Sequence, residues 1–426
     1  MTARRAWIGS GLAVGAGIGI WSIGNWIFFV LVGRLLGPRD YGLVAALLSG
    51  CLVIYVLCSG LGPALAGSNR GHPPNAIFAR AVRIAIMTTV VVMAISAAVV
   101  VIVGTTISGF PTTATLGAVA VLAGIAVFPL SMGQLQGEGN FTGYGLGLVT
   151  VGVTRPLAFV ALWFGGVKVL SPMLGTSASW IIGSAVTLVL ARRALHTEPI
   201  SPTSIQWDGF RKALLPNAVG VTAIAVLTNA DVITARLVLH SRESGLFAAA
   251  SAISQGLFLV PQVFITLLIP RLAARRAEGR SSATLAATGF LGTTVTGAIF
   301  VGLMLPLGQL LMRLTYGGAF RDSGNLLPFY GVAMTGMGCT IVLLYHQLAR
   351  RDFRYSWCLL GIAGAQIASL ALFARSSNAI IAVDLACAVA AVVVHEVLAR
   401  GSGERIIDGL RRLSSAATAR ARVPRT

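Results

Sequence analysis

The chain has 426 residues, of which 56% are apolar and only 11% are charged, and its mean hydropathy is +0.84. Soluble domains carry roughly 25% charged residues, so this composition cannot surround a large core with a water-exposed surface. It excludes a soluble enzyme, a nucleic-acid-binding module and a disordered scaffold, and it predicts an integral membrane protein.

Twelve stretches are apolar over about the 20 residues that a helix needs to cross the hydrocarbon core of a bilayer. We therefore predict an all-α polytopic membrane protein, because a transmembrane barrel would need short alternating strands. The first stretch is too long for a signal peptide and is expected to be an uncleaved span. The predicted spans are 8–32, 42–66, 81–104, 114–136, 144–167, 174–191, 214–237, 246–269, 284–306, 326–348, 357–374 and 379–399.

The positive charges are distributed unevenly between the two sides of these spans. The N-terminus, the even-numbered loops and the C-terminal tail hold 23 of the 32 Lys and Arg residues, whereas the odd-numbered loops hold 8. Positively charged segments stay in the cytoplasm, so both termini are predicted to be cytoplasmic. Topology explains most of the net charge of +19, and no nucleic-acid partner is expected.

One break in composition, around Pro199 and Pro202, divides the chain into two halves of six spans. We predict an N-terminal six-helix lobe at 1–191, a cytoplasmic linker at 192–213, a C-terminal six-helix lobe at 214–399 and a basic cytoplasmic tail at 400–426.

The two halves also align with each other. RLLGPRDYGLVAA, from Arg34, matches RLVLHSRESGLFAA, from Arg236, after one inserted residue, and upstream Asn25 lies opposite Asn229. Two repeats with the same number of spans and the same orientation are parallel repeats, related by an axis along the membrane normal. Such repeats are typical of transporters, in which the substrate site lies between two similar bundles.

Four motifs, spread over most of the chain, resemble those of the polysaccharide flippases of the multidrug/oligosaccharidyl-lipid/polysaccharide exporter superfamily, the Wzx-like O-antigen and exopolysaccharide translocases. The second motif departs from the family pattern, since Asn140 stands where relatives commonly have a basic residue. The motifs are GRLLGPRDYGLVAALLSG from Gly33, QGEGNF from Gln136, the segment from NADVITARL at Asn229 to Ala273, and LTYGGAFRDSGNLLPFYGVA from Leu314.

The resemblance implies a bacterial inner-membrane transporter that flips a polyprenyl-pyrophosphate-linked oligosaccharide from the inner to the outer leaflet by alternating access, for cell-surface polysaccharide synthesis. It implies contacts with membrane lipids and with other membrane proteins of polysaccharide assembly. A multidrug or peptidoglycan-precursor exporter of the same superfamily stays open as an alternative.

Arg155 is the most unusual residue, because it lies near the middle of the fifth span. A charge at that depth costs at least about 2.5 kcal/mol, so it needs a partner or a wet cavity. Pro156 follows it and leaves the carbonyl of Gly152 without its helical donor. We expect Arg155 to anchor the pyrophosphate or an acidic sugar; the alternative is a structural Arg that a neighbouring span neutralises.

Asp231, in the seventh span, is the main candidate for coupling or switching. It could pair with Arg155 across the lobes, titrate as a proton site, or be a permanently paired packing charge. Asp384 is a second, weaker candidate. We expect Asp384, like His395 and Glu396, to reach an interface by snorkelling.

Arg34, Arg236, Asn25 and Asn229 complete the candidate substrate-binding residues. The two arginines lie at the outer ends of spans one and seven, where they flank a cavity mouth or anchor the helices at the interface. The two asparagines offer amide groups for sugar recognition, although interhelical hydrogen bonds need such groups as well.

The sequence shows no nucleophile elbow, phosphate-binding loop or paired carboxylates on an aqueous loop, so we expect no enzyme activity, no metal and no cofactor beyond a proton or sodium gradient. The five cysteines lie in apolar stretches and are expected to be small buried hydrophobes. A polymerase or ligase acting on lipid-linked sugars is the enzyme alternative, but it would be expected to have a large external loop.

Overall fold

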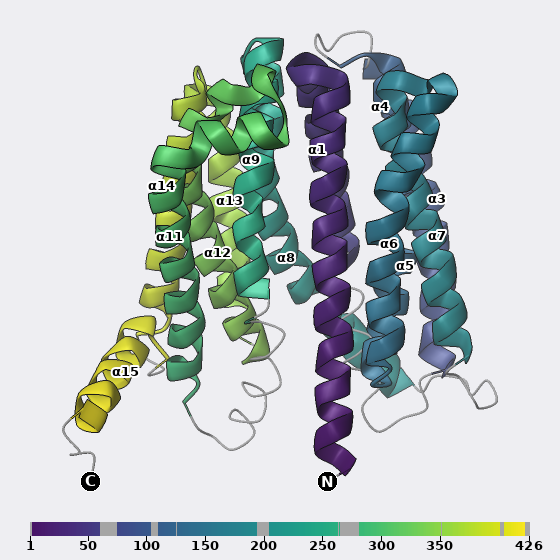
Figure 1. Ribbon diagram of the computed structural model, residues 1–426. Coiled ribbons are helices and arrows are strands. Elements are labelled where there is room, and N and C mark those ends of the chain that lie inside the picture. The colour runs from purple at the N-terminus through teal and green to yellow at the C-terminus, as the bar shows by residue number, and fades with distance from the viewer. Residues whose placement is uncertain are drawn as a thin grey trace.

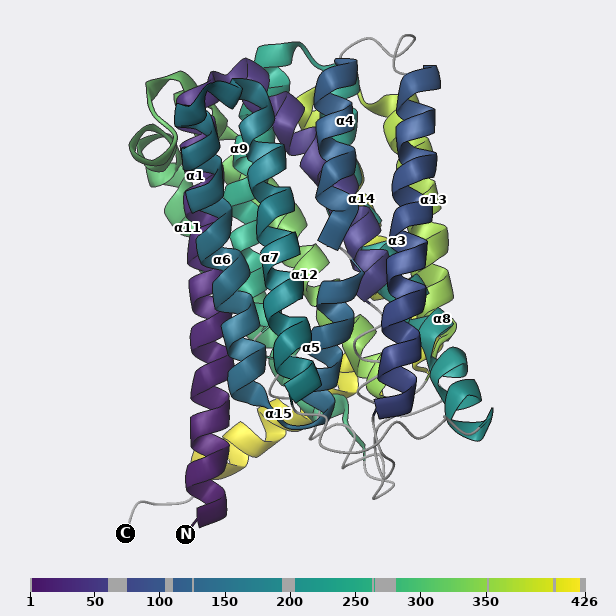
Figure 2. The same cartoon turned by 90° about the vertical axis from the view of Figure 1, so that its right-hand side faces the viewer.

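The computed structural model describes residues 2–59, 75–103, 110–124, 126–193, 204–262, 264, 281–350, 352–400 and 404–421. All regular structure in these ranges is helical (Figures 1 and 2). Among the described residues, ten segments are long and apolar enough to cross a membrane. Two of them, Ala13–Val56 and Phe141–Arg192, have 44 and 52 residues and each cover two predicted spans. The twelve-span, all-α expectation is therefore confirmed.

The N-terminal lobe begins with two spans joined in one kinked helix, α1. The kink lies at Gly37, whose φ of 74° is costly for residues with a side chain, and Pro38 follows it. The fourth predicted span is broken between α4 and α5 by a single 3₁₀ turn. The helices are α1 (Thr2–Ser59), α3 (Asn75–Val103), α4 (Thr112–Val121), α5 (Val127–Gly137), α6 (Phe141–Leu162) and α7 (Ser171–Arg193).

The C-terminal lobe follows the same plan. Its first helix begins at Ser204, ten residues before the predicted start at 214, so the linker predicted at 192–213 is shorter than expected. This difference arises because the apolar pattern shows only the part of a helix that lies in the hydrocarbon core. The helix itself can continue beyond the core. The elements are α8 (Ser204–Val238), α9 (Ser241–Ser254), α11 (Ala283–Thr315), η5 (Gly318–Asn325), α12 (Leu327–Ala349), α13 (Arg354–Phe373), α14 (Ser377–Leu398) and α15 (Ile406–Ala421).

A glycine seam holds α1 against α6 in the N-terminal lobe. A Cβ on Gly24 would lie 2.0 Å from the carbonyl oxygen of Gly152, and a Cβ on Gly17 would lie 2.7 Å from the Cα of Gly145. On α1 the two glycines are seven residues apart, and so are the two on α6; seven residues correspond to about two helical turns. Small residues are the usual means by which membrane helices approach closely, and this seam fixes which α6 side chains face α1.

The two lobes meet where α1 contacts α8 and α9, and α1 runs between the lobes in Figure 1. At this contact a Cβ on Gly42 would lie 2.8 Å from the nitrogen of Gly245, the residue that aligns with it in the repeat. Equivalent residues of two repeats can touch only close to the axis that relates them. The contact therefore agrees with a two-lobe, parallel repeat.

The seam predicts that Gly24→Ala destabilises the protein, since the new methyl group has no space against the Gly152 backbone. Overpacking of this kind costs about 1–3 kcal/mol. The matched control is Gly19→Ala on the same helix, where a Cβ meets nothing within 4 Å. Thermal unfolding in detergent should give a lower midpoint for Gly24→Ala only; equal midpoints would show that the seam is loose.

Candidate functional site

The Arg155 side chain lies inside the N-terminal lobe, between α1, α6 and α7. Its Nη1 donates a hydrogen bond to Oδ1 of Asn25, and its Nε donates to Oγ1 of Thr176 at 3.1 Å. The guanidinium carbon lies 4.1 Å from the ring centroid of Phe28, within cation–π range. The structure thus brings together Arg155 and Asn25, two of the predicted substrate-binding residues.

The guanidinium of Arg155 is fixed in position, but only some of its N–H groups make hydrogen bonds. Arg155 is half-buried, and its two bonds engage two of the five N–H groups of an arginine side chain. Both partners are neutral, so its positive charge is not cancelled by these contacts. The carbonyl of Gly152 does not open a polar path as expected, because it lies against Gly24 in the glycine seam.

Asp231 lies in the C-terminal lobe and is fully buried. Its Oδ2 accepts a hydrogen bond from the hydroxyl of Tyr330 on α12. The same hydroxyl oxygen lies 3.0 Å from Oγ of Ser251 on α9, and the amide of Gln255 donates to that Oγ at 3.3 Å. Sequence reasoning missed Tyr330 and Ser251, although Tyr330 stands inside a quoted motif.

Asp384 is also fully buried, so the expectation that it snorkels is wrong. Its Oδ1 accepts a hydrogen bond of 2.8 Å from Nε2 of Gln366 on α13, which also donates to the carbonyl of Leu227 at 3.0 Å. The carboxyl groups of Asp384 and Asp231 are close enough to influence each other electrostatically. The other oxygens, Oδ1 of Asp231 and Oδ2 of Asp384, are buried without a hydrogen-bond donor among the described residues.

The acids form a pair with each other, and the predicted pairing of Asp231 with Arg155 is not made. The bonds of Arg155 go to α1 and α7, whereas those of Asp231 stay within the C-terminal lobe. Asn229 is likewise not free for sugar recognition. It is buried and donates to the carbonyl of Ala225 in its own helix at 2.9 Å.

Arg34 and Arg236 each reach from one lobe to the other. Arg34 donates through Nε to the carbonyl of Thr315 at 2.5 Å and through Nη2 to that of Leu314, at the end of α11. Arg236 donates to the carbonyl of Arg39 at 3.5 Å. These arginines therefore bridge the lobes, a role that the sequence did not distinguish from interfacial anchoring.

An aromatic contact lies beside the Arg34 bridge. The hydroxyl oxygens of Tyr41 and Tyr316 are 3.3 Å apart, and the rings of Tyr41 and Phe320 meet edge to face with centroids 5.6 Å apart. Together with Arg34 these residues form what we term the outer clasp. It joins α1 to the end of α11 and to η5, on the side opposite the chain termini (Figure 1).

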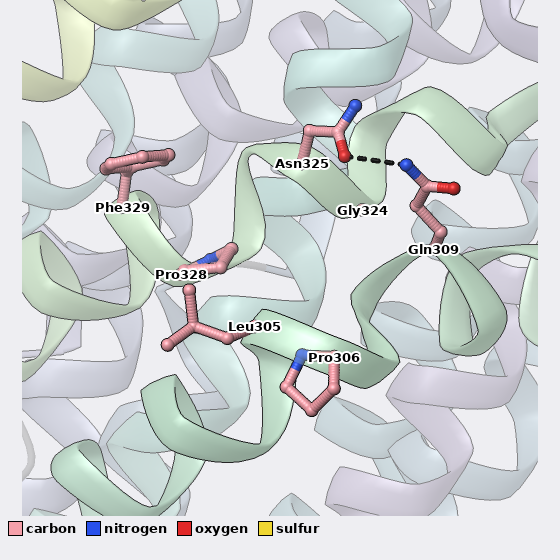
Figure 3. A pocket seen from close by; sticks show the side chains of 7 residues that line it. All are labelled: Leu305, Pro306, Gln309, Gly324, Asn325, Pro328 and Phe329. Atoms are coloured by element: carbon pink, nitrogen blue, oxygen red, sulfur yellow. Dashed lines mark hydrogen bonds between the residues drawn. The ribbon is translucent and has the colours of Figure 1, made fainter.

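A separate hollow of about 410 Å³ lies on the flank of the C-terminal lobe, between α11, η5 and α12 (Figure 3). Gln309 donates a hydrogen bond of 2.8 Å to Asn325 across it. None of the predicted site residues lines this hollow, whose walls are Leu305, Pro306, Gln309, Gly324, Asn325, Pro328 and Phe329.

Within the described residues, no three His, Cys, Asp or Glu side chains are grouped in a way that could hold a metal ion. The expectation that His395 snorkels is wrong. His395 is fully buried, and its Nδ1 lies 3.2 Å from Oε1 of Glu396.

The outer clasp predicts that Arg34→Gln combined with Tyr41→Phe separates the lobes at this end. Each hydrogen bond to a charged group contributes about 1.5–3 kcal/mol, so the loss of even one of the two Arg34 bonds should raise the population of the separated state at least about tenfold. Electron–electron distance measurements between spin labels at the exposed Phe164 and Leu310, in a cysteine-free background, should shift to longer distances. Arg242→Gln, which breaks an exposed pair with Asp322 inside one lobe, is the control and should leave the distances unchanged.

No protein-family model and no curated protein matches the chain by sequence. Solved structures do match. An inward-facing MATE-family multidrug resistance transporter of the MOP superfamily has a TM-score of 0.71 at 13% identity, over 95% of this chain and 99% of that one. The eukaryotic MATE transporter AtDTX14 gives 0.70 at 14% identity, over 96% and 99%. The lipid II flippase MurJ gives 0.66 at 15% identity, over 93% and 89%. The chain therefore has the two-lobe fold of these transporters.

Proposed function

We propose that this protein is an alternating-access transporter that flips a polyprenyl-pyrophosphate-linked oligosaccharide from the inner to the outer leaflet of the bacterial inner membrane. The observation that carries the proposal is the partly buried side chain of Arg155, whose guanidinium is oriented by Asn25 and Thr176. The likeness to MurJ, a lipid II flippase, supports a lipid-linked substrate. Neither catalysis nor a resident cofactor forms part of this function.

The chemistry of the N-terminal lobe favours an anionic substrate. A guanidinium binds phosphate through paired hydrogen bonds, and Arg155 keeps N–H groups for this purpose. The lobe predicted at 1–191 has only two acidic residues: Asp40, beside the kink of α1, and Glu138, at the end of α5. A cationic drug beside Arg155 would therefore meet a positive charge whose hydrogen-bond partners, Asn25 and Thr176, are both neutral. This favours the flippase over the multidrug exporter, while a peptidoglycan precursor carries the same pyrophosphate and stays the alternative.

The outer clasp supports alternating access. Its contacts join the lobes at one end only, so they must break for a substrate to leave on that side. Other membrane proteins of polysaccharide assembly would receive the substrate there.

Arg155→Ala should lower the rate of flipping by roughly 10- to 100-fold, which corresponds to the loss of one or two hydrogen bonds to a charged group. Arg155→Lys should keep part of the activity, because Lys retains the charge but not the forked geometry. The assay is exposure of a fluorescent lipid-linked oligosaccharide to an impermeant lectin in proteoliposomes. Lys168→Ala, at an exposed position in the connection between α6 and α7, is the control. Normal flipping by Arg155→Ala would leave this residue a structural role only.

We further propose that Asp231 and Asp384 couple transport to an ion gradient. Two carboxylates in contact and away from water cannot both stay ionised at reasonable cost. Their two oxygens without donors are satisfied if the pair shares one proton, or if a sodium ion replaces it. Binding and release of a proton or sodium ion at this acid pair would change the packing of α8 against α14. In this way the ion could change the conformation of the C-terminal lobe.

Asp231→Asn should abolish the dependence of flipping on pH or on sodium, since an amide keeps the bond from Tyr330 but cannot lose a proton. The measurement is the flipping rate in proteoliposomes over a pH series, with and without sodium. Asp322→Asn, which changes an exposed acid in the same lobe, should leave the profile unaltered. A normal rate and profile in Asp231→Asn would reduce the pair to helix packing.

A further inference from the structure

The tail helix α15 is fastened to the end of the C-terminal lobe by Glu404, which is buried. Its carboxylate accepts two 3.1 Å bonds from the backbone nitrogen of Ser282 and one of 3.0 Å from the Ser282 hydroxyl, and it lies 3.5 Å from Nε2 of His346. These bonds outweigh burial and lower the pKa of Glu404 to about 2. The carboxylate thus closes the free backbone end of α11 while it holds the start of the tail.

Glu396 makes the reciprocal contact at the end of α14. Its Oε1 accepts from the backbone nitrogen of Ile406 at 2.8 Å, and its Oε2 lies 3.6 Å from Nε of Arg405. It therefore caps the beginning of α15, where backbone N–H groups have no partner within the helix. Two carboxylates thus fix both the place and the direction of α15.

Packing sets the depth of α15 in the membrane. A Cβ on Gly409 would lie 2.4 Å from the carbonyl oxygen of Ala283, the first residue of α11. Because α11 enters the hydrocarbon core from this point, α15 lies at headgroup level. Figures 1 and 2 show it running out from beneath the bundle at the end where both termini lie, the side that the arginine distribution predicts to be cytoplasmic.

The side of α15 that faces away from the lobe is basic. Ile406 is buried, whereas Arg411 and Arg412 are exposed and Ile407 is 40% exposed. Arg412 lies at the edge of this side, where its Nη1 donates a hydrogen bond of 3.0 Å to Oγ of Ser281 and its other N–H groups stay available. Ile407 and Arg411 are four residues apart and share one edge of the helix. Asp408, the acidic residue of this helix, stands in its first turn.

We propose that this outward side of α15 binds the headgroups of anionic phospholipids in the leaflet next to the chain termini. The arginines meet the phosphate groups, and Ile407 meets the upper part of the acyl chains. An amphipathic helix at this depth with arginines outward is suited to such a surface. Because α15 is fastened to the ends of α11 and α14, bound lipid also holds these two helices in place at the membrane surface.

The test uses the purified full chain in neutral detergent, titrated with phosphatidylglycerol or phosphatidylcholine, with retained lipid measured by native mass spectrometry. Wild type should bind phosphatidylglycerol more tightly. A basic residue near an anionic surface contributes about fivefold, or about 1 kcal/mol, so Arg411→Gln with Arg412→Gln should weaken that binding by roughly 10- to 30-fold. Inorganic phosphate at the same concentration should not displace the lipid.

The control is Arg313→Gln with Arg321→Gln, which removes two exposed arginines at the opposite end of the lobe and should leave the affinity within about twofold. Each double variant loses one exposed hydrogen bond, from Arg412 to Ser281 or from Arg321 to Gln309, so the two should have similar thermal unfolding midpoints. The proposal would be overturned if the α15 variant bound phosphatidylglycerol as tightly as wild type. It would also be overturned if the control variant lost as much affinity as the α15 variant. No flipping is measured, so the result is independent of the proposed transport function.

Discussion

Every polar group that enters the hydrocarbon core must find its partner inside the protein, because lipid offers none. This constraint explains the helical architecture, and it also explains how the buried charges are arranged. Arg155 is held by an amide, a hydroxyl and an aromatic ring, and the two buried acids are held by Tyr330 and Gln366. In each case the partners come from neighbouring helices of the same lobe, so the charges also fasten the helices to one another.

The helices were predictable because a span is a local property: about 20 apolar residues in a row are sufficient. The partners of the charges were not, since they depend on which helices are neighbours. Tyr330 lies 99 residues from Asp231, and Gln366 lies 139 residues from the carbonyl of Leu227. Gln366 did leave a signal, as a polar residue in the middle of an apolar span. The pairing of Arg155 with Asn25 depends on the glycine seam, whose seven-residue spacing is visible in both helices.

The two repeats have similar arrangements of helices, but the polar residues buried between those helices differ. Asn25 and Asn229 are equivalent in the alignment, yet Asn25 bonds to Arg155 of a neighbouring helix and Asn229 bonds to its own helix. The N-terminal lobe thus carries a buried cation and the C-terminal lobe a buried acid pair. The two halves of the repeat therefore differ in the sign of the charge that they hold between their helices.

The contact between Gly42 and Gly245 also has a mechanical consequence. Because neither residue has a side chain, nothing interlocks at this point, and one backbone can roll on the other. The contact lies near one end of the bundle, while the first part of α1, from Thr2 to the kink at Gly37, extends about 50 Å away from it at 1.5 Å per residue. A rotation of roughly 10° about this fulcrum would move the far end of the helix by about 10 Å. A small adjustment at the pivot is thereby amplified into a wide opening on the opposite side of the membrane.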